Sequence, residues 1–314
     1  MPKVSVIIPI YGVEKYIERC ARSLFEQALD DMEFIFVDDC TTDKSISILE
    51  NVINDYPNRV AQTRICHHEK NMGLPIARQT GIKEASGDFI AHCDSDDWVD
   101  INMYKDMYDI AKSLDSDCVI CDAYKHDGEK ISSVIKGCFS TEKNKLQKDL
   151  LFQNVGWAVW NKLFKRDLYD RLVFSPKENM GEDMVLTMQL ITYSNKIAYL
   201  EKSYYYYYYN PESIVRKKDT AFVLLKAEQY YKNYLLLEQF YKNIHKYYEY
   251  KRAFNWIKYS IKTLLDYPSV ECREKWRATF PFVEFLILLY PEVSLFRKRM
   301  CLSSIIKNYL RLNK

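Results

Sequence analysis

The chain has 314 residues, of which 48% are hydrophobic, with 26 Tyr and 15 Phe against 8 Gly and 9 Pro. This composition excludes a disordered or low-complexity chain and is sufficient for one large domain with an appendage or for two domains. The formal net charge of +2 is unevenly distributed, because residues 216–314 carry 20 Lys or Arg and only 9 Asp or Glu. We therefore expect the C-terminal third to meet an anionic partner: a lipid surface, a lipid-linked phosphate or a nucleic acid.

The cysteines and the N-terminus predict a reducing, cytoplasmic location. The chain has nine cysteines, an odd number, and they show no regular spacing. Both features argue against a framework of disulfide bonds. Cys118 and Cys121 form a C-x-x-C inside a predicted strand, where residues three apart point to opposite faces, so we expect no redox or zinc role. The first residues, "MPKVSVIIPIY", lack the features of a signal peptide.

Apolar runs typical of buried strands alternate with segments of helical spacing over the first 93 residues. We predict strands at 4–8, 33–39, 60–65 and 88–93, and helices at 17–24, 42–53 and 74–87. Strands and helices that alternate in this way predict a mostly parallel sheet with helices on both faces. Ligands of such sheets bind where the strands reach their carboxyl ends.

The alternation weakens after residue 115, and the sheet is expected to become mixed there. "CVICDAY" and "EKISSVIKG" are predicted strands, Glu182 to Tyr193 is a predicted helix, and the run Tyr204 to Tyr209 is interpreted as a strand with alternating faces. From Asp219 onward the pattern is helical, which places a domain boundary near residue 217. The apolar stretch Phe280 to Phe296 lies either at a membrane surface or in an ordinary buried helix.

Three carboxylates, Asp94, Asp96 and Asp97, follow the strand at 88–93 within four residues. Their mutual repulsion at the end of a buried strand predicts a counter-charge. A divalent cation such as Mn or Mg fits, because hard ions prefer oxygen ligands and also bridge phosphate oxygens. The alternative is a solvated acidic turn that caps the next helix.

A second acidic pair, Asp38 and Asp39, ends the strand at 33–39 on the same edge of the predicted sheet. Carboxylates there can accept hydrogen bonds from a nucleotide base or from ribose hydroxyls. The alternative is turn chemistry with Thr41 and Thr42. A dinucleotide site is excluded, because the first strand is followed by the single Gly12 instead of G-x-G-x-x-G.

Five motifs occur together in an order that resembles family 2 glycosyltransferases. They are "VSVIIPIYGVEKYIERCARSLFEQ", "FIFVDDCTTDKS", "NMGLPIARQTGIKEASGDFIAHCDSDDW", "WNKLFKRDLY" and "GEDMVLTMQL". The resemblance covers most of residues 3–215. It implies an α/β fold of the GT-A (nucleotide-diphospho-sugar transferase) type, with residues 1–115 as a nucleotide-binding half, 116–217 as an acceptor half and 218–314 as a helical C-terminal region.

The resemblance also implies which residues hold the donor. The nucleotide-binding set consists of Pro9, Tyr11, Asp38, Asp39, Asn71, Gly73, Arg78, Asp94, Ser95 and Arg216. Asp94 and Asp96 correspond to the family's D-x-D pair, and Asp97 replaces or assists Asp96 because the register is ambiguous by one residue. Asp39 is expected at the base. For Arg78 a structural salt bridge is the alternative.

The family's catalytic base corresponds to the acidic pair of "GEDM", with Asp183 as first candidate and Glu182 as second. An inverting transfer needs a carboxylate that takes the proton of the acceptor hydroxyl. The alternative is an acidic residue that stabilises the start of a helix. Trp157 and Trp160 suit sugar or acceptor recognition, although core packing explains them nearly as well.

The expected function is therefore a metal-dependent, inverting transfer of a sugar, preferably from a UDP-sugar, to a glycan or lipid-linked acceptor of a bacterial surface polysaccharide. The processive Q-x-x-R-W signature is absent, which favours transfer of a single sugar. Cys40, Thr41 and Gly12 depart from the common family pattern. The protein is expected at the inner face of the membrane, held by its basic C-terminal region and not bound to nucleic acid. A non-catalytic scaffold and a nucleotidyltransferase are the alternatives.

Overall fold

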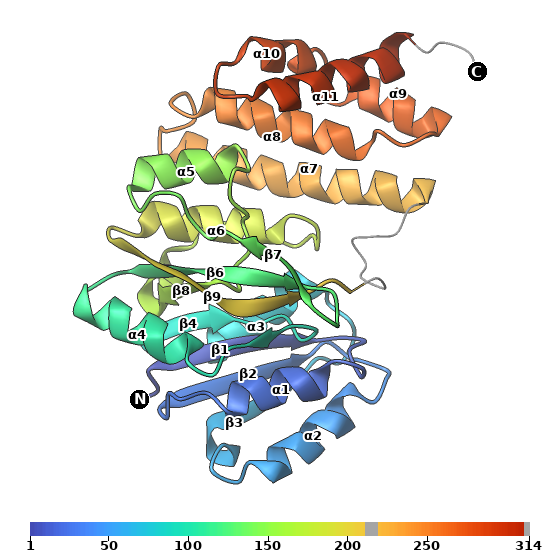
Figure 1. Ribbon diagram of the computed structural model, residues 1–314. Coiled ribbons are helices and arrows are strands. Elements are labelled where there is room, and N and C mark those ends of the chain that lie inside the picture. The colour runs from blue at the N-terminus through green and yellow to red at the C-terminus, as the bar shows by residue number, and fades with distance from the viewer. Residues whose placement is uncertain (211–218, 311–314) are drawn as a thin grey trace.

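The computed structural model describes residues 1–210 and 219–310, and these form one mixed sheet with a stack of helices beside it (Figure 1). The nine strands run in the order β3-β2-β1-β4-β8-β6-β9-β5, and β7 pairs with β6. Their bounds are β1 Val4–Ile10, β2 Met32–Asp38, β3 Thr63–His67, β4 Phe89–His92, β5 Trp98–Val99, β6 Cys118–His126, β7 Ile131–Ile135, β8 Lys162–Lys165 and β9 Ile197–Tyr208.

Helices flank the sheet and continue beyond it at the C-terminus. Their bounds are α1 Ile17–Phe25, α2 Ser45–Asp55, α3 Leu74–Glu84, α4 Met103–Ser113, α5 Lys143–Leu151, α6 Glu182–Tyr193, α7 Thr220–Asn243, α8 Lys251–Leu264, α9 Val270–Ala278, α10 Val283–Leu289 and α11 Leu295–Ile305. Short turns of other helix types lie at Val60–Gln62, Arg166–Arg171 and Ile306–Leu310.

The first four strands are parallel, which brings their carboxyl ends to one edge. Strand β1 pairs in parallel with both β2 and β4, and β2 pairs in parallel with β3. Every residue of β1 and β2 is buried, because α1 and α2 cover one face of these strands and α3 covers the other. Strand β8 runs antiparallel to β4 and β6, so the sheet is mixed from that point on. The predicted mixed α/β architecture is confirmed.

Some predicted element bounds were wrong. The strand expected from Val60 begins at Thr63, because residues 60–62 form a 3-10 turn. The helix expected to continue to Gly87 ends at Glu84. Gly87 instead packs against β1, where an added Cβ atom would come within 2.8 Å of the Ser5 backbone nitrogen.

The tyrosine run lies in β9, between β6 and β5, but its side chains do not simply alternate between faces. Tyr204 and Tyr205 are both buried, because the pairing register between β6 and β9 shifts on either side of Asp122. The Tyr205 hydroxyl lies beside Asp94, in the turn that follows β4. The expected strand is confirmed, and the expected strict alternation was wrong.

The C-terminal helices α7 to α11 stack above α6, with α7 level with α5 (Figure 1). One hydrophobic cluster joins Leu150 of α5, Met188 of α6, Tyr234 of α7 and Phe254 of α8. Because this cluster draws side chains from both sides of residue 217, the division into domains stays a prediction. Within the described residues, no helix combines the length and the apolar character needed to cross a membrane.

Candidate functional site

The acidic turn that follows β4 is tied to strand β9 through Asp97. The Tyr205 hydroxyl donates to Asp97 Oδ2 at 2.7 Å, and the Tyr208 backbone N–H donates to Asp97 Oδ1 at 2.6 Å. The Asp94 backbone N–H in turn donates to the same Tyr205 hydroxyl at 3.0 Å. Asp97 is 1% exposed, and this burial raises the pKa of its carboxyl well above the usual range. Both of its oxygens are therefore engaged within the fold.

Asp94 and Asp96 are more accessible than Asp97. Asp94 Oδ1 accepts from Arg78 Nη2 at 2.8 Å, and Asp96 Oδ2 accepts from Asn210 Nδ2 at 3.3 Å. Burial and the nearby Asp94 charge raise the pKa of Asp96. No group of three His, Cys, Asp or Glu side chains in the described part of the chain forms a ready metal site. Two carboxylates remain a suitable set for Mg or Mn, which complete their shells with phosphate oxygens and water.

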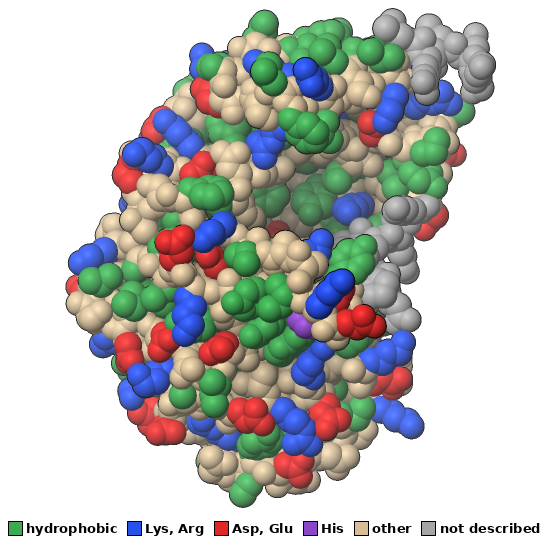
Figure 2. All heavy atoms as spheres, viewed as in Figure 1, with side chains coloured by type: hydrophobic (Ala, Val, Ile, Leu, Met, Phe, Trp, Pro, Cys, Tyr) green, Lys and Arg blue, Asp and Glu red, His purple; other side chains and the backbone are tan. Residues whose placement is uncertain are grey.

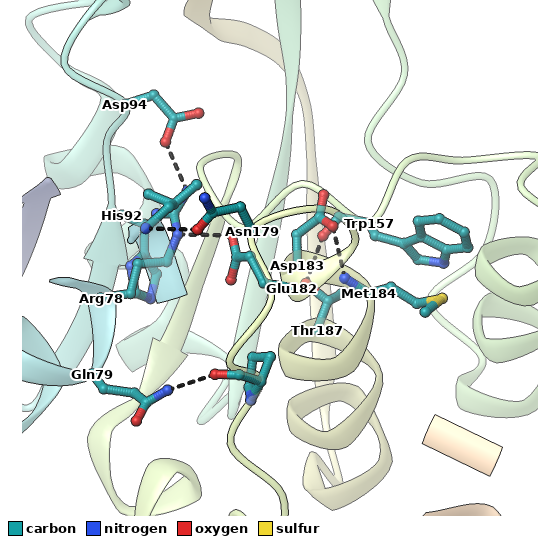
Figure 3. A network of polar contacts seen from close by, with 12 residues as sticks. Arg78, Gln79, His92, Asp94, Trp157, Asn179, Glu182, Asp183, Met184 and Thr187 are labelled. Atoms are coloured by element: carbon teal, nitrogen blue, oxygen red, sulfur yellow. Dashed lines mark hydrogen bonds and ion pairs between the residues drawn. The ribbon is translucent and has the colours of Figure 1, made fainter. Parts of the chain in front are cut away.

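Arg78 on α3 bridges the acidic turn and the start of α6 (Figure 3). Its Nη2 lies 2.8 Å from Asp94 Oδ1, and its Nε lies 2.9 Å from Glu182 Oε1. Arg78 is 3% exposed, and burial disfavours its charge, but the two carboxylates outweigh that effect and raise the pKa of the guanidinium. The structural salt bridge considered as the alternative is therefore present, and it joins two parts of the proposed site.

Glu182 and Asp183 begin α6, and the structure gives them different surroundings. Glu182 is 3% exposed and pairs with Arg78, and burial raises its pKa to about 7. Asp183 is only partly buried, and its one hydrogen-bond partner within residues 1–210 and 219–310 is the Met184 backbone N–H, at 2.9 Å. Burial also raises the pKa of Asp183. Asp183 is thus the more accessible carboxylate of this pair, and its role as base stays a prediction.

The carboxylate of Asp39 holds the loop before α3. Its Oδ1 accepts from the Met72 N–H at 2.7 Å and contacts His68 Nδ1 at 2.7 Å, while Oδ2 accepts from the Gly73 N–H at 2.8 Å. Turn chemistry with Thr41 was the alternative to nucleotide binding for this acidic pair. Asp38 makes that turn, because its Oδ1 accepts from the Thr41 N–H at 2.8 Å. The expected base contact of Asp39 stays a prediction.

The fold and the family follow from comparison with known proteins. The model of glycosyl transferase family 2 matches residues 5–173, which is more than half of the chain. The chain belongs to glycosyl transferase family 2. A glycosyltransferase of Bacillus subtilis named EpsJ is 34% identical over 225 residues, which are 68% of this chain and 63% of EpsJ. The chain therefore spans just under two thirds of the length of that relative.

Two solved structures show the same GT-A fold. Residues 1–349 of TarS from Staphylococcus aureus, in complex with UDP-GlcNAc, give a TM-score of 0.61 at 19% identity, covering 98% of this chain and 89% of that one. The mannosyltransferase PcManGT from Pyrobaculum calidifontis, in complex with GDP-Man and Mn²⁺, gives 0.56 at 15% identity, covering 99% and 88%. The GT-A fold expected from the motifs is confirmed.

The remaining residues predicted to bind the donor lie around the same edge, apart from Arg216. Pro9 is buried in β1, Tyr11 just beyond β1 is exposed, and Ser95 is buried in the acidic turn. Asn71 is exposed in the loop before α3. Gly73, with a φ of 88°, is the N-cap residue of α3, and an added Cβ atom would lie 2.6 Å from Asn179 Oδ1. Arg216 lies outside the described residues.

The two tryptophans near β8 have different roles. Trp160 is buried and stacks on Tyr205 with ring centroids 4.4 Å apart, so core packing accounts for it. Trp157 is partly exposed and lies close to Asp183 in Figure 3, and its carbonyl accepts from Thr187 Oγ1 at 2.6 Å. Trp157 is therefore the more accessible of the two tryptophans, and its role in acceptor recognition stays a prediction.

Buried Lys162 holds the loop that carries both tryptophans. Its Nζ donates to the Ala158 carbonyl at 2.6 Å and to Asn161 Oδ1 at 2.9 Å. Burial lowers the pKa of Lys162 to about 8. Asn161 and Lys162, the polar pair of "WNKL", therefore have a structural role, because they hold this loop in place.

Sequence reasoning missed the partners of the site residues. Tyr205 belongs to the six-tyrosine run, which was interpreted only as a strand, although a buried Tyr hydroxyl generally needs a polar partner. Asn179 and Asn233 gave no local signal, because each contacts a segment distant in the sequence.

Proposed function

We propose that the protein is an inverting glycosyltransferase that moves a single sugar from a nucleotide-diphosphate donor to a hydroxyl of a glycan or lipid-linked acceptor. Membership of glycosyl transferase family 2 supports this reaction class. The observation that carries the assignment of roles is the Arg78 bridge, which engages Asp94 and Glu182 but does not contact the carboxylate of Asp183, whose partner is the Met184 N–H. A UDP-sugar is the proposed donor, since the TarS structure that shares the fold is bound to UDP-GlcNAc.

In the proposed mechanism, Asp183 accepts the proton of the acceptor hydroxyl as its oxygen forms a bond to the anomeric carbon of the donor. The bond from that carbon to the diphosphate breaks on the opposite face, and the nucleotide diphosphate leaves with the electron pair. Asp94 and Asp96 are the proposed ligands of a Mn or Mg ion, which when bound neutralises charge on the diphosphate. Asp97 holds the turn through Tyr205 and Tyr208.

The metal assignment predicts different effects for two neighbouring aspartates. Replacing Asp96 with Asn is expected to weaken Mn-dependent UDP binding at least about 10-fold, because even partners of metal ligands contribute on that scale. Asp97→Asn should chiefly lower the thermal midpoint of unfolding, since it disturbs contacts to Tyr205 and Tyr208. Calorimetric titration with UDP, GDP, CDP and dTDP, each with Mn or with EDTA, measures the first effect.

Each outcome of that titration has a meaning. Metal-dependent binding of one nucleotide diphosphate supports the transferase and identifies the class of donor. Equal loss of metal dependence in both variants assigns Asp97 to the metal. Binding of none of the four nucleotides contradicts the proposed function and favours a non-catalytic scaffold.

We also propose that the C-terminal helices contact the cytoplasmic face of an anionic membrane. Several of the hydrophobic groups on the surface in Figure 2 lie over the uppermost helices. The large apolar side chains that are exposed on and around α10 and α11 are Phe282, Phe285, Leu286, Leu289, Leu295, Phe296, Met300, Leu302 and Ile306. Residues 216–314 also carry the excess of basic side chains. An apolar surface beside positive charge fits a lipid surface with anionic headgroups.

The membrane proposal predicts that Leu289→Gln with Phe296→Gln weakens binding to vesicles of phosphatidylcholine and phosphatidylglycerol by about 10-fold or more, because each buried side chain contributes about 1.5–3 kcal/mol. The control is Ile131→Gln with Val134→Gln, an exposed apolar pair on β7. Cosedimentation measures binding. Equal binding by both double variants contradicts the proposal. If the wild-type protein is a dimer, and only the Leu289→Gln and Phe296→Gln double variant is a monomer, the apolar surface is instead a contact with a second copy of the chain.

A further inference from the structure

The loop that leads to the proposed base, Glu178–Gly181, is held by helix α7 of the C-terminal region. Asn233 Nδ2 donates to the Glu178 carbonyl and to the Met180 carbonyl, each at 2.9 Å. The Met180 N–H donates to Gln229 Oε1 at 3.2 Å. Asn233 is 0% exposed, so these backbone groups receive from it the hydrogen bonds that water cannot supply.

The last residue of the loop, Gly181, lies directly against Tyr230 of α7. Gly181 has a φ of 79°, and a Cβ atom placed on it would lie 2.7 Å from Cδ1 of the Tyr230 ring. Only glycine allows both this backbone conformation and this close approach. Burial, together with the charges of Asp183 and Glu182, raises the pKa of Tyr230.

The other side of the same loop contacts the donor half. Asn179 Oδ1 accepts from the Leu74 N–H at 3.0 Å, at the start of α3 and beside Gly73. Figure 3 shows Asn179 near Arg78 and Glu182, with Asp183 following in the chain. The four residues of the loop Glu178–Gly181 therefore connect the donor side of the site, the proposed base and the C-terminal helices.

We propose that helix α7 is part of the active site, in which Gln229, Tyr230 and Asn233 are positioning residues that fix the orientation of Asp183. This inference rests on the proposed function, in which Asp183 is the base. The amide of Asn233 sets the path of the loop, and the ring of Tyr230 closes the turn at Gly181. Figure 2 shows a hollow between the sheet and these upper helices, where an acceptor can approach.

The first test measures the loop without relying on activity. In Asn233→Ala, hydrogen exchange of a peptide covering residues 175–184 should become faster, because two carbonyl contacts of the loop are lost. Gln229→Ala, at a partly exposed position, is a milder second variant that removes only the partner of the Met180 N–H. The control is Tyr248→Ala, at a strongly exposed tyrosine. Unchanged exchange in both α7 variants overturns the proposal.

The second test separates positioning from general loss of stability. The probe is hydrolysis of UDP-glucose, UDP-galactose, UDP-GlcNAc and GDP-mannose with water as acceptor. Asn233→Ala and Tyr230→Ala should lower kcat by about 10²-fold, the scale reported for a misplaced group, and leave the donor KM unchanged. Tyr230→Phe keeps the ring that covers Gly181 and should restore kcat.

The outcomes distinguish this proposal from the proposed function. A wild-type protein that binds none of UDP, GDP, CDP and dTDP contradicts the proposed function, while the exchange measurement still decides whether α7 holds the loop. Donor hydrolysis that is unchanged in Asn233→Ala and Tyr230→Ala overturns the positioning role. A parallel rise of donor KM assigns these residues to donor binding instead.

Discussion

Replacing Asp183 with Asn is expected to lower kcat by about 10²–10⁴-fold, the usual contribution of a general base. Asn cannot accept the proton of an acceptor hydroxyl, but it has almost the same shape. The carboxylate of Asp183 has Met184 as its one hydrogen-bond partner in the described residues, so the fold should tolerate the change. Calorimetric UDP binding should stay within about 2-fold of wild type, since nothing in the proposed mechanism ties Asp183 to the nucleotide.

The pH dependence of kcat provides an independent measurement on the same residue. Burial raises the pKa of Asp183 above that of an exposed aspartate, which is about 3.9. The base works only when deprotonated, so kcat should fall as the pH decreases through this raised pKa. The acidic limb should therefore lie at a higher pH than that of an exposed aspartate in wild type and be absent from the residual activity of Asp183→Asn.

The matched control for Asp183→Asn is Glu182→Gln. Glu182 pairs with Arg78 at 2.9 Å, so its replacement should weaken folding more than Asp183→Asn does. If Glu182→Gln abolishes turnover in a folded protein while Asp183→Asn remains near wild type, Glu182 is the base and our assignment is wrong.

Replacing Arg78 with Met is expected to destabilise the protein by about 3–5 kcal/mol, the usual consequence of removing one partner from a buried ion pair. The change leaves the buried carboxylate of Glu182 without its cation and also frees Asp94. The free energy of unfolding in urea measures the effect. Arg78→Lys should recover part of the loss, because one ammonium group does not reproduce two contacts from a planar guanidinium.

A surface arginine serves as control for Arg78. Arg22 also contacts two carboxylates, those of Glu18 and Asp55, but all three side chains are exposed. Arg22→Met should change stability far less, because water screens and replaces such contacts. If the two variants lose the same stability, the burial of the Arg78 bridge contributes nothing measurable.

The sequence was sufficient to predict the alternating strands and helices and the acidic turn. These features depend on local pattern: apolar runs form β1, β2 and β4, and charged residues follow directly where the buried strand ends. The motifs also predicted the catalytic base within the pair Glu182 and Asp183, with Asp183 as first candidate. Local pattern gave no physical reason for that order, because the difference in surroundings depends on Arg78, which is 104 residues away in the chain.

Dependence on residues distant in the sequence also explains what the sequence analysis missed at the acidic turn and in the loop Glu178–Gly181. Asp96 and Asp97 are adjacent and chemically alike, and they differ because Tyr205, 108 residues later, takes the second of them. Asn233 lies on a helix whose pattern showed only apolar periodicity. Its role arises from the loop it meets, 53 residues earlier at Met180. Long-range polar contacts of this kind are set by the tertiary fold and leave no mark on local periodicity.

The contact between Asp94 and Tyr205 also has a consequence for synthesis on the ribosome. These residues are separated by 111 positions, and at a synthesis rate of about 5–20 residues per second Tyr205 emerges roughly 5–20 s after Asp94. During that interval the turn lacks the hydroxyl that binds it, and α7 has not yet been made. The nascent chain therefore cannot complete the proposed site, and a chain that stops before β9 should be inactive even if its first strands have folded.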